Sequence, residues 1–146
     1  KWKIYKNGHL QSVGRFYKDK MVGTWKHYHA NGKLHQIGKF ENDKQNGNWM
    51  FYYDTGEYMG NGNLINDKMD GVWKWYYKNG NLYTERLYDN GKLMSIKSCV
   101  DKIGKILNCG ELIKGNGYLL GHDIENETDN IVKSEFKDGV FINNDN

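Results

Sequence analysis

The feature that most constrains this chain is a tryptophan that returns every 23 or 24 residues. Trp2, Trp25, Trp49 and Trp73 follow one another at intervals of 23, 24 and 24. Self-similarity at such a period is typical of repeat architectures, in which each repeat supplies one supersecondary unit that stacks on its neighbours. The sequence therefore predicts a stack of small units.

Each unit reads G-x-W-x-x-Y, then a turn with N-G or T-G, then L, G and F. Asn-Gly between two β-prone segments favours a two-residue type I′ hairpin, because both residues accept a positive φ. A composition with 18 Gly, no Pro and 14% aromatic residues is also typical of a turn-rich β protein. Each unit is therefore predicted to be a β-hairpin.

The turn fixes the cross-strand pairs of the second unit. With residues 31–32 as the loop, Trp25 lies opposite Gly38, and Gly23 lies opposite Phe40. A large side chain thus faces a residue without one in each pair. We expect the indole to lie flat over the glycine of the strand with which it pairs and to shield that backbone from water.

The third unit repeats the arrangement. With residues 55–56 as the loop, Trp49 lies opposite Gly62, and Gly47 lies opposite Leu64.

The fourth unit departs from it. Gly71 again stands two residues before the tryptophan, but the turn sets Trp73 opposite Arg86. A guanidinium can stack on an indole, and we expect that contact here.

Successive hairpins should join edge to edge, because an isolated hairpin is only marginally stable. The predicted fold is all-β, an elongated single-layer antiparallel sheet of about 10–12 strands whose open edges could pair into oligomers. The expected units are repeats at about 1–21, 22–45, 46–69 and 70–93, a divergent hairpin at 94–112 and a degenerate capping repeat at 113–146.

The two cysteines flank a glycine. Cys99 and Cys109 have Gly104 at their midpoint, so a hairpin centred there would set the two sulfurs directly across from each other. A disulfide in that position would suit an oxidising, extracytoplasmic compartment, secreted or at the cell surface. The alternative is a pair of reduced, half-buried thiols.

No catalytic cluster is evident. His27 and His29 alternate and share one face, whereas His35 should pair with Tyr28 on the other face, so we predict no metal site and no cofactor. Nucleophile-elbow and zinc-protease motifs are absent from the sequence. The 21 basic and 18 acidic residues are scattered singly, so nucleic acid is not the expected partner. We predict a protein that is not an enzyme.

The repeated pattern resembles the MORN (membrane occupation and recognition nexus) repeat variant of bacterial proteins often labelled antitoxin-like. The residues that carry the resemblance are Gly23, Trp25, Tyr28, Gly32, Leu34, Gly38 and Phe40, with their counterparts in the next two units. It covers residues 1–93 with good spacing and 113–140 loosely. The resemblance implies an elongated stack of hairpins, contacts with proteins or lipids, and no chemistry of its own.

The remaining candidate is a ladder of tyrosines on the face opposite the tryptophans, formed by Tyr5, Tyr28, Tyr52 and Tyr76. Exposed aromatic residues with flanking lysines suit protein recognition. We predict a bacterial scaffold for protein–protein interaction, of the antitoxin, immunity or adhesion kind. The alternatives are glycan or cell-wall binding by exposed indoles, binding to a membrane surface, or internal packing alone.

Overall fold

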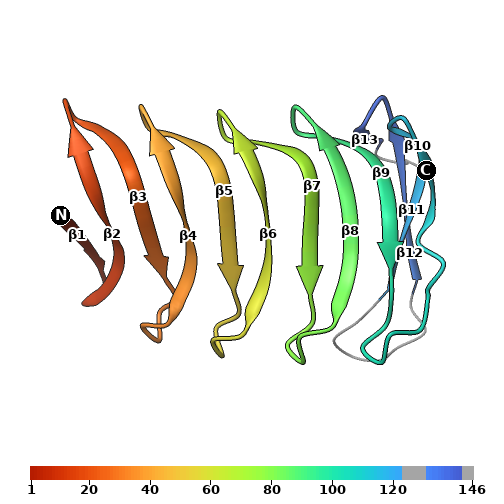
Figure 1. The fold of residues 1–146 in the computed structure, drawn as a ribbon, viewed down its shortest axis with the longest axis horizontal. Helices are drawn as coiled ribbons and strands as arrows, with labels where there is room; N and C mark the ends of the chain where they lie inside the picture. The colour runs from red at the N-terminus through yellow and green to blue at the C-terminus, as the bar shows by residue number, and fades with distance from the viewer. Residues whose placement is uncertain (123–130, 143–146) are drawn as a thin grey trace.

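The computed structural model describes residues 1–122 and 131–142, which form thirteen strands in two antiparallel sheets (Figure 1). The first sheet contains β1 (Trp2–Lys6), β2 (His9–Tyr17), β3 (Lys20–Tyr28), β4 (Leu34–Glu41), β5 (Lys44–Tyr52), β6 (Tyr58–Ile65), β7 (Lys68–Tyr76), β8 (Leu82–Asp89) and β9 (Lys92–Cys99). The second contains β10 (Gly110–Ile113), β11 (Asn116–His122), β12 (Ile131–Lys137) and β13 (Val140–Ile142). Within the described residues there is no helix of the length and apolarity needed to cross a membrane.

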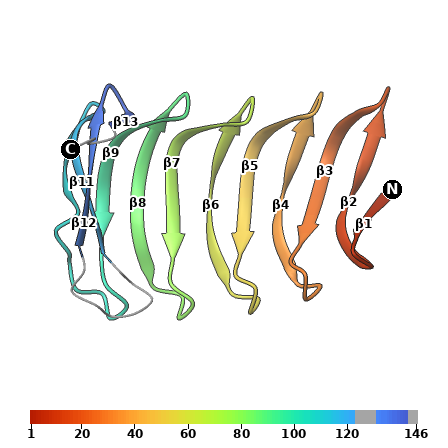
Figure 2. The same cartoon turned by 180° about the vertical axis from the view of Figure 1, so that it is seen from behind.

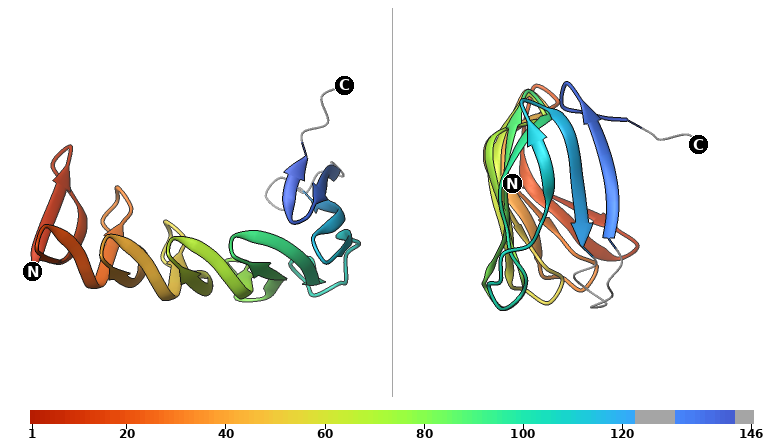
Figure 3. Two further views of the ribbon diagram at one scale, coloured as in Figure 1. Left: turned by 90° about the horizontal axis from the view of Figure 1, so that it is seen from above. Right: turned by 90° about the vertical axis from the view of Figure 1, so that its right-hand side faces the viewer.

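Strand order follows the sequence in both sheets, so the molecule is a continuous series of hairpins (Figure 2). The predicted all-β fold of tandem hairpins is confirmed. The difference is that β10–β13 form a separate sheet, which stands out from the first sheet at the β9 end (Figure 3). The ladder stops because residues 100–109 contribute one isolated bridge, between Val100 and Ile106, instead of a strand. Part of the expected capping repeat, residues 123–130 and 143–146, lies outside the described residues.

The cross-strand pairs predicted from the turns are confirmed. Trp25 pairs with Gly38, and Gly23 pairs with Phe40. In the next two hairpins the same positions give Trp49 with Gly62, Gly47 with Leu64, and Trp73 with Arg86.

The turn type within the hairpins was predicted wrongly. In the second unit, Gly32 donates to the His29 carbonyl at 2.9 Å and has φ +84°, but Asn31 does not have a positive φ. The Asn31 side chain accepts from the Lys33 amide at 3.0 Å, which satisfies a backbone donor within the turn. The loop is therefore a three-residue turn with a bulge, and Tyr28 pairs with Leu34.

This one-residue shift moves side chains to the other face of the sheet. Leu34 comes to the face of Tyr28, its partner in the ladder. His35 was expected opposite Tyr28, but its ring lies 4.2 Å from that of His29.

Two-residue turns with two positive φ angles do occur, at the opposite end of the strands, where they join successive hairpins. Examples are residues 42–43 and 66–67, with φ between +48° and +69°. Each such turn is bonded to the preceding unit, because Asp43 Oδ1 accepts from the Met21 amide and Asp67 Oδ1 accepts from the Gln45 amide, both at 2.6 Å. These bonds hold consecutive hairpins in register.

The indoles occupy different glycines from those expected. A Cβ added to Gly38 would overlap the ring of Trp49, not that of its ladder partner Trp25. The same relation places Trp25 over Gly14 and Trp73 over Gly62. Trp25, Trp49 and Trp73 therefore each cover the glycine eleven residues earlier, in the preceding hairpin, and join two units together.

A bulge explains this placement. Between β4 and β5 the pairing passes from Ile37–Met50 to Lys39–Asn46, so residues 47–49 stand opposite the single residue Gly38. Gly47 has φ +81°, and nothing lies within 4 Å of the place where its Cβ would be. It is therefore required for its backbone conformation, whereas Gly38 is required for the space that the indole fills.

The indoles form a continuous buried stripe. Trp25, Trp49 and Trp73 are 0, 0 and 1% exposed and pack with Phe40 and Leu64. We call this side of the sheet the tryptophan face.

The stripe ends at β8. Arg86 stands where the pattern places glycine, and Lys97, eleven residues later, stands where it places tryptophan. The expected stack of Arg86 on Trp73 does not form among the described residues, because that indole lies over Gly62 on β6. Arg86 instead lines a cleft between β8 and β9 and the second sheet, together with Phe136.

Candidate functional site

The face opposite the tryptophans carries a continuous row of tyrosine and leucine side chains. The row consists of the cross-strand pairs Tyr5–Leu10, Tyr28–Leu34, Tyr52–Tyr58 and Tyr76–Leu82. It runs across β1 to β8 beside the intra-hairpin turns, and we call it the tyrosine row. The structure thus places the four tyrosines singled out in the sequence at equivalent positions of four successive hairpins.

Aromatic rings touch within the row. Tyr58 lies between Tyr52 and Tyr76, with ring centroids 5.8 and 5.3 Å away. Burial, and then the neighbouring Tyr76 and Tyr52, raise the pKa of Tyr58 above its ordinary value. Tyr5, in the edge strand, is 59% exposed. The row therefore combines half-buried rings with an accessible end.

Sequence reasoning missed Tyr58 and the leucines of the row. The two-residue loop assumed for each hairpin assigned these residues to the tryptophan face, and the bulge in the real turn reverses that assignment. An available signal was the tyrosine at position 58, where the other three units have leucine. A side chain of that size and polarity is more readily accommodated at a partly exposed site.

Exposed cations surround the β1–β4 part of the row. Lys3, Arg15, Lys26 and Lys39 are exposed and lie on the same face of the sheet as Tyr28. Two of them, Arg15 and Lys26, line a groove of about 350 Å³ together with Tyr28. Carboxylates on this face include Glu41, at the end of β4, and Glu85, which lies 3.7 Å from Lys74. The charge of the face is thus positive at the β1 end and mixed at the β8 end.

Side chains from the other face fix the backbone beneath the row. The Tyr53 hydroxyl donates to the Tyr76 carbonyl at 2.7 Å, and the Tyr77 hydroxyl donates to the Val100 carbonyl at 2.7 Å. His29 Nε2 lies 2.9 Å from the Tyr52 carbonyl in the equivalent place. Burial raises the pKa of Tyr77 to about 12, so its hydroxyl stays protonated as a donor. The row is therefore preorganised across units, which lowers the entropy lost on binding.

The histidines were also candidates for function. His29 and His35 are in ring contact, and His27 stacks between Trp25 and Trp49 with centroids 6.3 and 6.1 Å away. Burial lowers the pKa of both His27 and His35, so the neutral rings are favoured. Among residues 1–122 and 131–142, no three His, Cys, Asp or Glu side chains are grouped to hold a metal ion.

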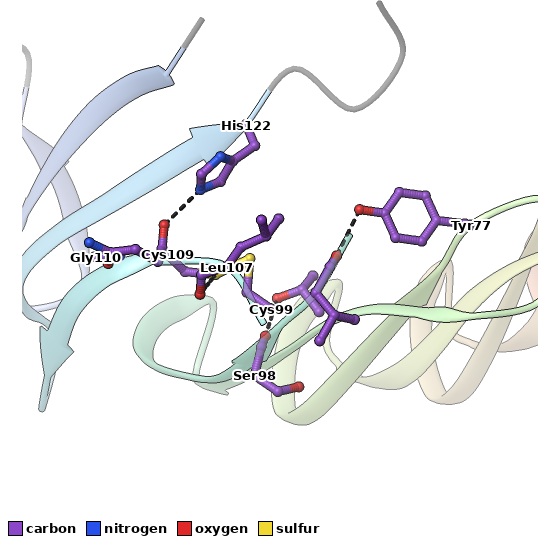
Figure 4. Close-up of a disulfide and its surroundings, with 10 residues drawn as sticks. Tyr77, Ser98, Cys99, Leu107, Cys109, Gly110 and His122 are labelled. Atoms are coloured by element: carbon purple, nitrogen blue, oxygen red, sulfur yellow. Dashed lines mark hydrogen bonds between the residues drawn. A yellow bond between two sulfur atoms is a disulfide. The ribbon is translucent and has the colours of Figure 1, made fainter. Parts of the chain in front are cut away.

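Cys99 and Cys109 form a disulfide between the two sheets (Figure 4). Their Cα atoms are 6.1 Å apart, and each residue is 7% exposed. The hairpin is not centred as expected, because Leu107, not Cys109, donates its amide to the Cys99 carbonyl. The bond connects the end of β9 to the residue before β10, and so ties the second sheet to the repeats.

These features define a protein of tandem β-hairpin repeats, with a core of interlocked indoles and glycines and a preorganised aromatic and cationic face. The family model for the MORN repeat variant matches residues 21–42 and 69–90, which cover the hairpins β3–β4 and β7–β8. Two of its hairpins are thus similar to repeats of the MORN repeat variant family. No curated protein matches the chain.

Proposed function

We propose that this protein is a non-catalytic scaffold that binds an acidic segment of another protein along the tyrosine row. An antitoxin, immunity or adhesion role would use a contact of this kind. The observation that carries the proposal is the row itself, eight equivalent aromatic or aliphatic positions across eight consecutive strands. Aromatic anchors supply most of the energy of protein interfaces.

The charges indicate the chemistry of the partner. Lys3, Arg15, Lys26 and Lys39 surround the exposed end of the row, and the one carboxylate of strands β1–β4, Glu41, lies at the end of β4. Complementary charge steers a partner and sets its orientation more than it adds affinity. An acidic segment would therefore engage the β1 end first and extend toward β8.

Glycan binding is supported less well. Stacking of sugars requires accessible indole faces, and Trp25, Trp49 and Trp73 are 0, 0 and 1% exposed. Trp2 is 62% exposed but lies at the end of the sheet, whereas Tyr5 and Tyr58 are exposed members of a continuous row, which suits an extended polypeptide.

The test is affinity capture of partners from the native host extract with the wild-type chain and with Tyr28→Ala/Lys26→Glu. The double variant removes one anchor and reverses one charge of the groove, and should lose the partner. Tyr17→Ala is the matched control, because Tyr17 is 63% exposed but lies at the other end of β2, beside the inter-hairpin turn.

Circular dichroism must first show that all three proteins unfold at the same temperature. Equal capture by the double variant and the control would refute the proposal. Binding of the wild-type chain to anionic vesicles, without capture of any protein from the extract, would indicate a membrane surface instead.

A further inference from the structure

One cation occupies a position that the earlier hairpins give to glycine. Arg86 pairs with Trp73 on the tryptophan face, as Gly38 pairs with Trp25 two hairpins earlier. Trp49 covers Gly38, but the residue eleven positions after Arg86 is an exposed lysine, Lys97. The Arg86 side chain instead lines the cleft between β8 and β9 and the second sheet.

The charge of Arg86 has no partner among the described residues. Its Nε is buried and makes no hydrogen bond. The ion pairs between described side chains, Lys74–Glu85 and Lys133–Glu135, do not include it. Nearly all buried polar groups in proteins are hydrogen-bonded, and an unpaired charged donor is unfavourable. An acceptor from outside the chain would satisfy this donor.

The cleft places that donor beside an apolar surface. Its volume is about 380 Å³, and its lining includes Leu93 of β9, Leu119 of β11 and Phe136 of β12. The ring of Phe136 meets that of Phe141, another lining residue, edge to face at 5.9 Å. A concave site of this size, apolar with a few polar groups, is typical of small-molecule binding.

The two walls of the cleft are held in place. The Leu93 amide donates to the Gly139 carbonyl at 3.2 Å, and the Gly115 amide donates to the Met94 carbonyl at 2.8 Å. These bonds join β9 to the turns of the second sheet, which stands out from the first (Figure 3). The disulfide is a further link between the sheets. Because the walls are fixed, little entropy is lost when a ligand binds between them.

We propose that this cleft binds a small carboxylate with an aromatic body. The carboxylate accepts two parallel hydrogen bonds, from Nε and one Nη of Arg86, in the bidentate geometry that a guanidinium favours. The aromatic body lies against Phe136 and Leu119. Among the described residues that line the cleft, the charged ones are Arg86 and Lys92, both cations, so the site attracts an anion.

A single buried guanidinium balances one negative charge, which favours a carboxylate over a phosphate. The site lies on the tryptophan face and is separate from the tyrosine row, so it adds a second binding function to the one proposed above.

The test observes the arginine itself. The chain has two arginines, Arg15 and Arg86, and so two side-chain Nε–H signals in a nitrogen–proton correlation spectrum. The probe is hydrocinnamate, which should shift the Arg86 signal, leave the Arg15 signal in place and bind with a dissociation constant of about 1 mM or below. The controls are hydrocinnamide, which lacks the charge, and propionate, which lacks the ring. Each should bind roughly tenfold more weakly.

Variants test the two parts of the site. Arg86→Gln and Phe136→Ala should each weaken hydrocinnamate binding by about tenfold or more. Lys44→Gln is the matched control, because it removes an exposed charge at the start of β5, and it should bind as the wild type does. The titration of the wild-type chain decides the matter if either cleft variant does not fold.

Equal binding of hydrocinnamate and hydrocinnamide would overturn the proposal, and so would equal shifts of both arginine signals, which indicate adventitious binding to surface cations. No shift of the Arg86 signal at millimolar hydrocinnamate would also overturn it. The same carboxylate could belong to the end of a polypeptide, and the peptide acetyl-Gly-Gly-Phe distinguishes the two sources. Tighter binding of that peptide than of hydrocinnamate would support the site and assign its ligand to a polypeptide terminus.

Discussion

Gly38 tests the arrangement of the core, because its ladder partner and the ring that covers it belong to different hairpins. It pairs with Trp25, but a Cβ at Gly38 would lie 2.5 Å from Cγ of Trp49 and nearer still to Cδ2. Ordinary contact begins at 3.4 Å, so in Gly38→Ala the indole must retreat by about 1 Å. Trp49 is fully buried, so it has no free space to enter.

The expected loss of stability in Gly38→Ala is about 3 kcal/mol, at the upper end of the range for overpacking a well-filled core. Gly47→Ala is the control, because its Cβ would meet nothing within 4 Å and only its φ of +81° is unfavourable. That backbone strain should cost about 1 to 2 kcal/mol. Urea unfolding followed by far-ultraviolet circular dichroism measures both changes.

A double-mutant cycle decides which tryptophan is responsible. Trp49→Phe should relieve much of the cost of Gly38→Ala, giving a coupling of about 1 kcal/mol or more, because the smaller ring leaves room for the methyl group. Trp25→Phe should combine with Gly38→Ala almost additively. A larger coupling with Trp25 than with Trp49 would refute the placement of each indole over the glycine of the preceding hairpin.

Three further predictions concern stability. Burial keeps the folded pKa of His27 below its unfolded value near 6.5, so the unfolded chain binds more protons than the folded one. The stability of the protein should therefore fall as the pH drops below that value. In His27→Phe, which matches Phe51 of the next unit, the urea midpoint should change less between pH 7.5 and pH 5. Cys99→Ser/Cys109→Ser should cost roughly 2 to 3 kcal/mol and speed amide exchange in β10–β13 more than in β3–β6, and equal effects would contradict a tie between the sheets. Asp67→Ala should lose about 1 to 2 kcal/mol and the protection of the Gln45 amide, whereas Asp67→Asn should retain both.

Local signals were sufficient for the hairpin units because they are short-range. The period of the tryptophans and the Asn-Gly turns determine where strands reverse, and the distance from turn to tryptophan determines the pairs Trp25–Gly38 and Trp49–Gly62. These pairs were correct even though the turn type was wrong. The pairing shifts back within one residue, because His35 on β4 is left unpaired between Leu34 and Gln36, so pairs further along the strands keep the predicted register.

The same reasoning could not assign the side chains near the turn to one face of the sheet or the other. Whether Leu34 joins Tyr28 or the opposite face depends on the conformation of Asn31, which donates to the Asp54 carbonyl of the next unit. That contact lies 23 residues away in the chain. The tyrosine row, the candidate site, therefore takes its composition from contacts between units.

The sequence by itself determined the repeat, the hairpins and the cross-strand pairs, because turns and alternation act over a few residues. Only the tertiary structure decided that Trp49 covers Gly38 and that β10–β13 leave the first sheet. Both depend on how one hairpin lies against the next. A bulge at Gly47 places the Trp49 indole over a strand of the preceding hairpin. Arg86 and Lys97 replace the glycine and the tryptophan of the pattern, so the interlocking ends before β10.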